Sequence, residues 1–438
     1  MKHLLLIFSA TFLFGYQTLP AKVPQQNSSE KTLDNASIHQ EIQQLADAIF
    51  DSLVLLRRDF HRHPELSGQE QRTSEKVADY LKTLGLDVKT GIGGFGVVGT
   101  LKGALPGKKV AWRADMDAMP SDTKDAVAFE SVNPGVRHIC GHDVHITVTL
   151  GLAQVLAAQK EKLAGTVYFV FQPSEENLQG AQAMLNDGLF NIIDPDEMYA
   201  LHLTPFPAGT VATKTDELFA AYNKLRIRLK GGENSKELIA FTKEQIQQLQ
   251  NIEPDSNFWN MENMGDPEIG IAGPNTIYKD FTIISGGVEL HEDDKNVMLT
   301  AYLSSSDVLQ RNAVVPFLRS KFSKSKYADA LINIDYISET PTILNDKKLT
   351  RENLDFLTSI YGEEQVIPMT GVVADGRSDD FALFQEKAPT VYFFLGGSNF
   401  EKGLISQPHA PYFEVDERCI NTGVKLFSSM LFERLKNN

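Results

Sequence analysis

The chain has 438 residues, 42% of them hydrophobic, which is enough to bury a large core and to form more than one domain. Its net charge of −15 and pI near 5.2 argue against nucleic acid and anionic membrane surfaces as partners, because both require basic patches. Small molecules remain the expected partners.

The first residues have the order of segments found in a secretory signal peptide. A basic start is followed by an apolar run over residues 4–16 and by small residues up to Ala21, after which we expect cleavage. The run is too short for a membrane span, so an uncleaved anchor is the weaker alternative. We therefore expect a signal peptide over 1–21, a flexible leader over 22–37, and an exported protein, periplasmic or secreted, with no membrane partner after cleavage.

Residues 38–219 alternate between helical and strand-like patterns. Apolar spacing predicts helices over 38–56 and 73–84, and strands over 96–101 and 110–114 are separated by the turn-prone pair Pro106-Gly107. A helix over 146–159, a strand over 166–171 and a helix over 181–187 follow. This alternation predicts an α/β catalytic domain with a mainly parallel sheet, whose chemistry collects at the carboxyl ends of the strands. Five side chains are expected at that edge: Asp115, Asp117, Glu175, Glu176 and His202.

The pattern changes over residues 220–338, which predict a separate α+β domain. Strands are expected at 224–229, 281–284, 297–303 and 331–336, and helices at 243–251 and before the last strand. His291 is the single histidine of this stretch, which contains no cluster of metal ligands. The α/β pattern resumes over 339–438, with a helix at 349–361, a strand at 390–395 and a helix at 415–435. His409 lies in a proline-flanked loop between the last two elements.

Residues 138–145 place one thiol, three imidazoles and a carboxylate close together, which favours a metal site. A disulfide between Cys140 and Cys419 is the competing interpretation, but the neighbouring histidines would have no role in it. Deprotonated Cys140 can bridge two cations, and His142, His202 and His409 suit zinc, manganese, cobalt or nickel. Glu176 adds a carboxylate. We therefore expect two divalent metal ions.

Glu175 is the predicted catalytic group. Adjacent residues of an extended segment point in opposite directions, so Glu175 and Glu176 are not expected to bind the same ion. A carboxylate that binds no metal can take a proton from the attacking water and deliver it to the leaving amine. The alternative is a solvated acidic turn, but the apolar residues 169–173 deliver the pair from a buried strand.

The remaining aspartates and histidines are assigned supporting roles. Asp117 is predicted to hold the second ring nitrogen of a ligand histidine and so fix its tautomer. Asp143 and His145 would do the same or act as ordinary hydrogen-bonding residues of a loop. His61 and His63 are expected to shape the substrate cleft or to pack, and not to bind metal.

These features together resemble the M20 metallopeptidases, in particular the amidohydrolase branch with hippurate hydrolases, auxin-conjugate hydrolases and related carboxypeptidases. Seven separated markers carry the resemblance: residues 60–66, residues 112–120, the Cys140 segment, residues 171–176, His202, residues 378–381 and Pro408-His409. The resemblance implies a zinc-peptidase-like catalytic domain with an inserted ferredoxin-like lid that serves homodimerisation. It also implies the ligand set Cys140, His142, Glu176, His202 and His409, with Glu175 as the catalytic carboxylate.

The lid departs from the family pattern. Family members commonly carry a histidine after a Lys-Gly-Gly-like turn, whereas Lys230-Gly231-Gly232 is followed here by Glu233. The usual Asn-Val-Ile-Pro stretch and an Arg-bearing strand are not evident over 290–303. Removing one oxyanion donor costs on the order of a hundred- to a thousandfold in rate, so we expect altered substrate recognition.

The predicted function is hydrolysis of the amide bond of an N-acyl amino acid or short peptide by an exported metal-dependent enzyme. A carboxypeptidase or dipeptidase of the same family is the first alternative. The alternative from another class is a metal-loaded binding protein that has lost turnover through its lid, and the complete ligand set argues against it.

Overall fold

The computed structural model describes residues 28–436 except 126, 233–234, 294, 341 and 375–377. The chain forms two compact units, residues 1–41 and 42–438. The predicted signal peptide lies outside the described residues. Helix α1 (Ser28–Arg62) begins within the predicted leader, because residues 28–37 contain no proline or glycine to stop it. Within the described part of the chain, no helix combines the length and apolar content that a membrane crossing requires.

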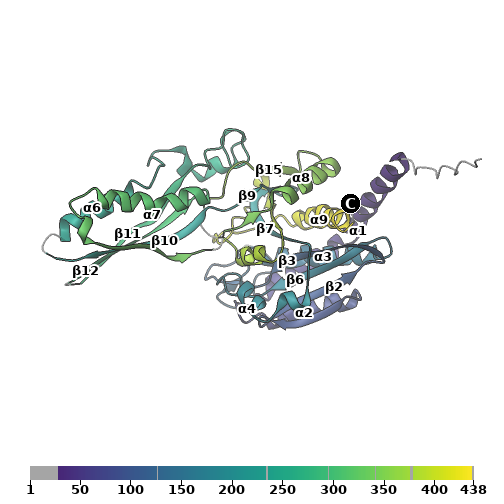
Figure 1. The fold of residues 1–438 in the computed structure, drawn as a ribbon. Coiled ribbons are helices and arrows are strands. Elements are labelled where there is room, and N and C mark those ends of the chain that lie inside the picture. The colour runs from purple at the N-terminus through teal and green to yellow at the C-terminus, as the bar shows by residue number, and fades with distance from the viewer. Residues whose placement is uncertain are drawn as a thin grey trace, which may run out of the picture. The chain divides into compact units, whose positions relative to one another are not determined.

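An eight-stranded mixed sheet with the order β1-β2-β6-β3-β7-β16-β8-β15 forms the centre of the larger unit (Figure 1). Its strands are β1 (Asp87–Ile92), β2 (Gly96–Lys102), β3 (Leu105–Asp115), β6 (Ala164–Gln172), β7 (Glu197–Pro207), β8 (Val211–Thr213), β15 (Val366–Pro368) and β16 (Thr390–Ser398). The four neighbours β6, β3, β7 and β16 run parallel. Strand β16 is buried along its whole length, as expected for a strand covered on both faces. The predicted α/β class with a mainly parallel sheet is confirmed.

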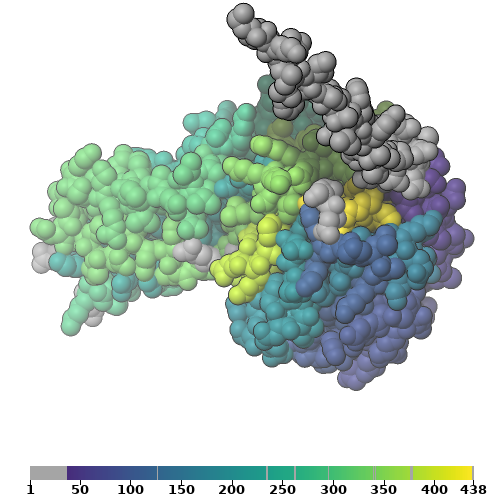
Figure 2. Space-filling view, turned by 45° about the vertical axis from the view of Figure 1, so that its right-hand side comes forward, coloured from purple at the N-terminus to yellow at the C-terminus, as the bar shows by residue number. Residues whose placement is uncertain are grey.

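Both ends of the larger unit's sequence contribute to this catalytic domain. The helices are α2 (Gln71–Thr83), α3 (His142–Ala158), α4 (Gly180–Asn186), α5 (Leu189–Ile192), α8 (Lys347–Tyr361) and α9 (Arg418–Arg434). Helix α9 packs against α3, so yellow C-terminal residues lie beside blue ones in Figure 2. Two small ribbons complete the domain: β4 (Met119–Pro120) with β5 (Val136–Arg137), and β9 (Asp216–Glu217) with β14 (Leu344–Asn345).

The turn expected at Pro106-Gly107 is a wrong prediction, because both residues lie inside β3. The chain turns earlier, at Gly103, whose N–H donates to the carbonyl of Gly165 at 2.9 Å. The pairing of β3 with β6 shifts register between Leu105 and Lys109, so the proline and the glycine occupy a bulge. A bulge tolerates proline because the ladder hydrogen bonds are already interrupted there.

The lid is a four-stranded antiparallel sheet with two helices on one face (Figure 1). Its elements are β10 (Ala221–Lys230), α6 (Ser235–Gln247), β11 (Thr282–Glu292), β12 (Asn296–Ser305), α7 (Val308–Ser323) and β13 (Leu331–Glu339). The chain order is strand-helix-strand-strand-helix-strand, and the spatial order β11-β12-β10-β13 places the first and third strands in the centre. The predicted ferredoxin-like lid is confirmed. Glu233, where the resemblance implies a histidine, lies outside the described residues.

A long segment between α6 and β11 was not anticipated from the sequence. It contains two short 3-10 helices, η1 (Asn257–Trp259) and η2 (Met261–Gly265), and its Ile271 and Tyr278 belong to the core of the catalytic domain. The carbonyl of Ile271 accepts the N–H of Gly371 at 2.8 Å, and that of Tyr278 accepts the N–H of Val372 at 2.8 Å. The segment therefore braces the strand connection that leads into residues 378–381.

Candidate metal centre

The five predicted metal ligands come together from separate elements. Cys140 precedes α3, His142 is the first residue of α3, Glu176 follows β6, His202 lies within β7, and His409 lies between β16 and α9. They form two groups that share one residue: Cys140 with His142 and His202, and Cys140 with Glu176 and His409. Within each group the ligand atoms lie within 4.8 Å of one another. The thiol of Cys140 is 3.2 Å from Nε2 of His202 and 3.2 Å from Nε2 of His409.

The donor atoms of this cluster fit a metal. His142 donates Nδ1–H to the carbonyl of Asp117 at 2.8 Å, and its Nε2 is buried without a hydrogen-bond partner among the described residues. Oε1 of Glu176 is buried and unpartnered in the same way. His202 donates Nδ1–H to the carbonyl of Leu203 at 2.7 Å, which leaves the lone pair of Nε2 for the cluster. A thiol together with imidazole and carboxylate atoms around one small space is the donor set of a divalent transition-metal site.

The pKa values of the clustered side chains also bear on cation binding. Burial raises the pKa of the Cys140 thiol well above its usual value, and the carboxylates of Glu176 and Glu175 raise it further. Burial lowers the pKa of His142, but Asp115 and other neighbouring carboxylates outweigh it and raise that pKa to about 10. Burial lowers the pKa of His202 well below its usual value, which favours the neutral imidazole. Binding of metal would therefore release protons from Cys140 and His142.

Glu175 and Glu176 stand in a turn and not, as predicted, in an extended segment. Ser174 adopts a left-handed conformation with φ of 55°, and the N–H of Leu178 donates to the carbonyl of Glu175 at 2.7 Å. Both carboxylates consequently approach Nε2 of His142, Glu175 at 3.8 Å and Glu176 at 3.7 Å. The argument that neighbouring residues point in opposite directions was wrong, because it holds for strands only.

Glu175 borders the cluster: it belongs to neither of the two groups that contain Cys140, but it forms a further group with His142 and Glu176. Its side chain is buried, and burial raises its pKa well above the usual value, with further increases from Asp379 and Glu176. A buried carboxylate with a raised pKa is a candidate for proton transfer. Glu175 therefore lies next to the ligand groups, where the predicted general base and acid is expected.

Asp117 lies against the second ring nitrogen of His142, as predicted: its backbone carbonyl accepts Nδ1–H at 2.8 Å, and Oδ1 of its carboxylate is 3.5 Å from the same atom. The carboxylate also accepts the backbone N–H groups of Glu175 at 3.1 Å and Glu176 at 3.0 Å, a role that was not predicted. The hydroxyl of Ser67 donates to the same carboxylate at 2.6 Å. Asp117 therefore anchors the turn that carries the two glutamates.

His145 is fixed by hydrogen bonds at both ring nitrogens. The N–H of Leu203 donates to Nε2 at 2.8 Å, so Nδ1 carries the proton and donates it to Asp115 at 2.6 Å. His145 therefore has no lone pair for a metal and ties α3 to the strand that holds His202. It stands on the first turn of α3 and not in a loop.

Asp143, His61 and His63 are likewise engaged in packing contacts. Asp143 accepts a hydrogen bond from His61 Nδ1 at 2.8 Å and forms an ion pair with Arg57, whose Nε lies 2.8 Å from the carboxylate; the side chains of Asp143, His61 and Arg57 are all buried. His63 contacts the carbonyl of Asp59 through Nδ1 at 2.9 Å. Asp143, His61 and His63 are not part of the ligand groups around Cys140.

A buried guanidinium beneath the cluster was missed by the sequence analysis. Arg113 is fully buried and donates to Asp115 at 2.7 Å and to Asp379 at 2.8 Å. Asp380, 3.3 Å from Arg113, has its pKa raised to about 7, because burial and Asp379 outweigh the guanidinium. The signal for Arg113 was a charged residue in the otherwise apolar predicted strand 110–114, two positions before Asp115. Its other acidic partners, Asp379 and Asp380, stand 266 and 267 positions away in the chain and gave no such signal.

Backbone strain is concentrated at the centre. Five described non-glycine residues have positive φ, and three of them are Ser174 (55°), Leu178 (58°) and His409 (63°). Such conformations cost about 1–3 kcal/mol each and persist where the surroundings enforce them, most often at functional sites. The strain therefore marks the same loops as the ligand geometry does.

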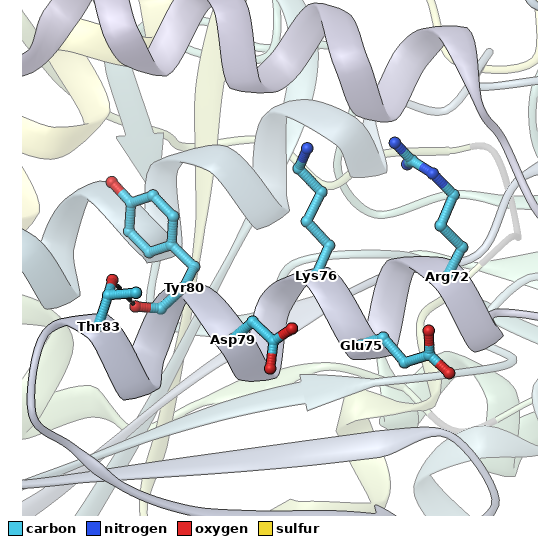
Figure 3. A pocket seen from close by; sticks show the side chains of 6 residues that line it. All are labelled: Arg72, Glu75, Lys76, Asp79, Tyr80 and Thr83. Atoms are coloured by element: carbon cyan, nitrogen blue, oxygen red, sulfur yellow. Dashed lines mark hydrogen bonds between the residues drawn. The ribbon is translucent and has the colours of Figure 1, made fainter.

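Two further features concern a rejected alternative and a surface hollow. Both cysteines are free, so the alternative of a disulfide between Cys140 and Cys419 is wrong. A surface hollow of about 440 Å³ runs along α2 and is lined by polar side chains of that helix (Figure 3). Two of them, Arg72 and Lys76, bind the carboxylate of Asp59 at 2.7 Å each. The hollow contains none of the predicted ligands.

Comparisons with known proteins agree with this geometry. A sequence profile of peptidase family M20/M25/M40 matches residues 111–433. Thermostable carboxypeptidase 1 of Saccharolobus solfataricus is 31% identical over 86% of this chain and 93% of its own length. N-acetyldiaminopimelate deacetylase of Enterococcus faecalis is 28% identical over 87% of this chain and 97% of its own. A Bacillus subtilis protein, described as a dinuclear metal binding peptidase of the M20 family, superposes with a TM-score of 0.70 at 26% identity, over 88% of this chain and 98% of its own.

Proposed function

The chain belongs to peptidase family M20/M25/M40 and is a metal-dependent hydrolase of amide bonds, and from this premise we propose that it cleaves N-acyl amino acids. The observation that carries the proposal is the pair of ligand groups sharing Cys140, with Glu175 beside them and outside both. We take the substrate class from the similar N-acetyldiaminopimelate deacetylase. The name of that protein describes an amide between an acyl group and an amino acid.

The chemistry follows from the positions of the side chains. Divalent cations held by Cys140 and its partners would polarise the amide carbonyl and lower the pKa of a water molecule. Glu175 takes the proton of that water on its carboxylate and returns it to the leaving nitrogen. Asp117 accepts the backbone N–H of Glu175, so that the carboxylate of Glu175 keeps its position during proton transfer.

A second candidate is release of the C-terminal residue from short peptides. It is favoured by the similarity to a carboxypeptidase over most of the chain. The two candidates share the metal centre and differ in what lies on the acyl side of the scissile bond.

A substrate panel distinguishes the candidates. Purified protein is stripped with a chelator, resupplied separately with zinc, manganese, cobalt or nickel, and incubated with N-acetyl, N-benzoyl and longer N-acyl amino acids and with dipeptides of the same C-terminal residue. We expect release of the amino acid from the N-acyl compounds, abolished by chelation and restored by metal. Faster release from dipeptides would favour the carboxypeptidase, and bound metal without any release would contradict both.

We also propose that the protein is exported and that its lid forms a homodimer. Export is supported by the basic, apolar and small-residue order of residues 1–21. N-terminal sequencing of protein recovered from outside the cytoplasm should begin at Lys22. A chain that starts at Met1 would contradict cleavage. Light scattering should give the mass of two chains, and deletion of the lid should give that of one.

A further inference from the structure

A second carboxylate, Glu70, holds the turn that carries Glu175 and Glu176. Glu70 is completely buried, and its Oε1 accepts the backbone N–H of Ser174 at 2.8 Å and that of Gly68 at 3.0 Å. Its Oε2 is buried without a hydrogen-bond partner among the described residues. Burying a carboxylate with an unsatisfied oxygen costs folding free energy, so we expect Glu70 to have a compensating role at this position.

The reason lies in the geometry of the turn. Three consecutive backbone N–H groups, those of Ser174, Glu175 and Glu176, donate to three carboxylate oxygens. Asp117 supplies two of these oxygens and Glu70 the third. Ser174 holds the left-handed conformation with φ of 55°, where an L-residue is strained, and Glu70 accepts the hydrogen bond of that residue.

We propose that Glu70 is a positioning residue, which keeps Ser174 in its strained conformation and thereby aims Glu176 at the metal and Glu175 at the reacting water. The inference rests on the proposed function for the role of Glu175, and on the ligand geometry alone for that of Glu176. The described hydrogen bonds of the Glu70 carboxylate go to Gly68 and Ser174, and Glu70 belongs to none of the possible ligand groups.

The reach of this effect follows from the two ligand groups. Glu176 belongs to the group with Cys140 and His409 and to a group with His142 and Glu175, whereas the group of Cys140 with His142 and His202 contains no residue of the turn. Loss of the Glu70 anchor should therefore weaken the ion that Glu176 helps to bind and spare the ion of Cys140, His142 and His202. Outer residues that orient ligands contribute about 10- to 100-fold to metal affinity or activity.

The test combines three variants of Glu70 with a matched control. Glu70→Ala removes the carboxylate that accepts the hydrogen bonds, and Glu70→Asp shortens the side chain by one methylene. Glu70→Gln keeps an oxygen that can accept the same hydrogen bonds. The control is Glu65→Ala, because Glu65 belongs to the same loop and also accepts two backbone N–H groups, those of Arg72 and Thr73, but does not touch the turn.

Zinc titration of the full chain in metal-buffered solution gives the first measurement. We expect two ions in the wild type, and in Glu70→Ala an unchanged first ion with the second weakened about 10- to 100-fold. Glu70→Gln and Glu65→Ala should titrate like the wild type. Amide hydrolysis by the loaded enzyme should show a loss in kcat with little change in KM for Glu70→Ala.

Specific outcomes would overturn the proposal. One is a folded Glu70→Ala protein with the zinc titration and kcat of the wild type. The others are a loss of zinc affinity in Glu65→Ala equal to that in Glu70→Ala, or a loss of zinc affinity in Glu70→Gln as large as in Glu70→Ala. If Glu70→Ala does not fold, the zinc titration of Glu70→Asp replaces it, and a titration curve like that of the wild type would refute the positioning role of Glu70. The zinc titration needs no substrate, so it judges Glu70 even if no amide is hydrolysed and the proposed function fails.

Discussion

Exchanging each of the two adjacent glutamates for glutamine should separate catalysis from metal binding. Glu175→Gln keeps the size of a side chain that lies 3.8 Å from His142 but loses the ability to take a proton. General acid–base groups contribute about 10²- to 10⁴-fold. A loss of that size corresponds to about 2.7–5.4 kcal/mol of transition-state stabilisation. We expect kcat to fall by this factor, with two ions still bound and KM unchanged.

Glu176→Gln should behave in the opposite way. Oε1 of Glu176 is an orphaned atom of the cluster, and a neutral amide oxygen is a weaker ligand than a carboxylate. We expect the second ion to be lost on dialysis and the rate to recover in part with excess metal. Elemental analysis together with initial rates on the preferred N-acyl amino acid distinguishes the two variants. Full hydrolysis by Glu175→Gln, or loss of an ion from it, would refute the assignment of Glu175 as general base.

Three further predictions follow from the site and its surroundings. Cys140→Ala should remove both ions, since Cys140 belongs to both ligand groups, whereas His409→Ala should remove one; equal stoichiometry in the two variants would contradict the sharing of Cys140. The pKa of Asp416 is lowered from 3.8 to about 2, because hydrogen bonds from Arg418 and Asn399 outweigh its burial. Ionised Asp416 therefore contributes about 2 kcal/mol to the free energy of unfolding above pH 3.8, and this contribution is lost as the pH falls toward 2. In urea unfolding, the free energy of unfolding of Asp416→Asn should depend less on pH in that window than that of the wild type. Leu178→Gly should raise the free energy of unfolding by about 1 kcal/mol, because glycine adopts φ of 58° without strain; a lower melting temperature would count against strain at this position.

Most of the metal centre could be predicted because its signals are local. Cys140 and His142 lie in one short segment of rare ligand types, and the elements that bring Glu176, His202 and His409 to it have clear apolar patterns. Parallel strands then dictate that side chains following them share one edge of the sheet. The fold class and the lid could be predicted for the same reason, since both depend on the order of elements along the chain.

The remainder depends on contacts between distant residues. The turn after β6 looks extended in sequence, and its actual course is set by Asp117 and by Glu70, which stands 104 positions before Ser174. Pro106 in β3 is tolerated only because the register against β6 shifts there. The pairing of Ile271 with Gly371 also leaves no periodic signal. Propensity and spacing carry no information on such partners, so these features appear only in three dimensions.

The distribution of the ligands along the chain determines the order in which the centre can be completed. His409 lies 269 positions after Cys140, with the whole lid between them. During synthesis from the N-terminus, the group of Cys140, His142 and His202 can form as soon as β7 has joined the sheet, whereas the second group must wait for the last segment of the chain. A chain shortened before His409 would lack a ligand of the second group, so we expect hydrolytic activity only after the segment with His409 has been synthesised.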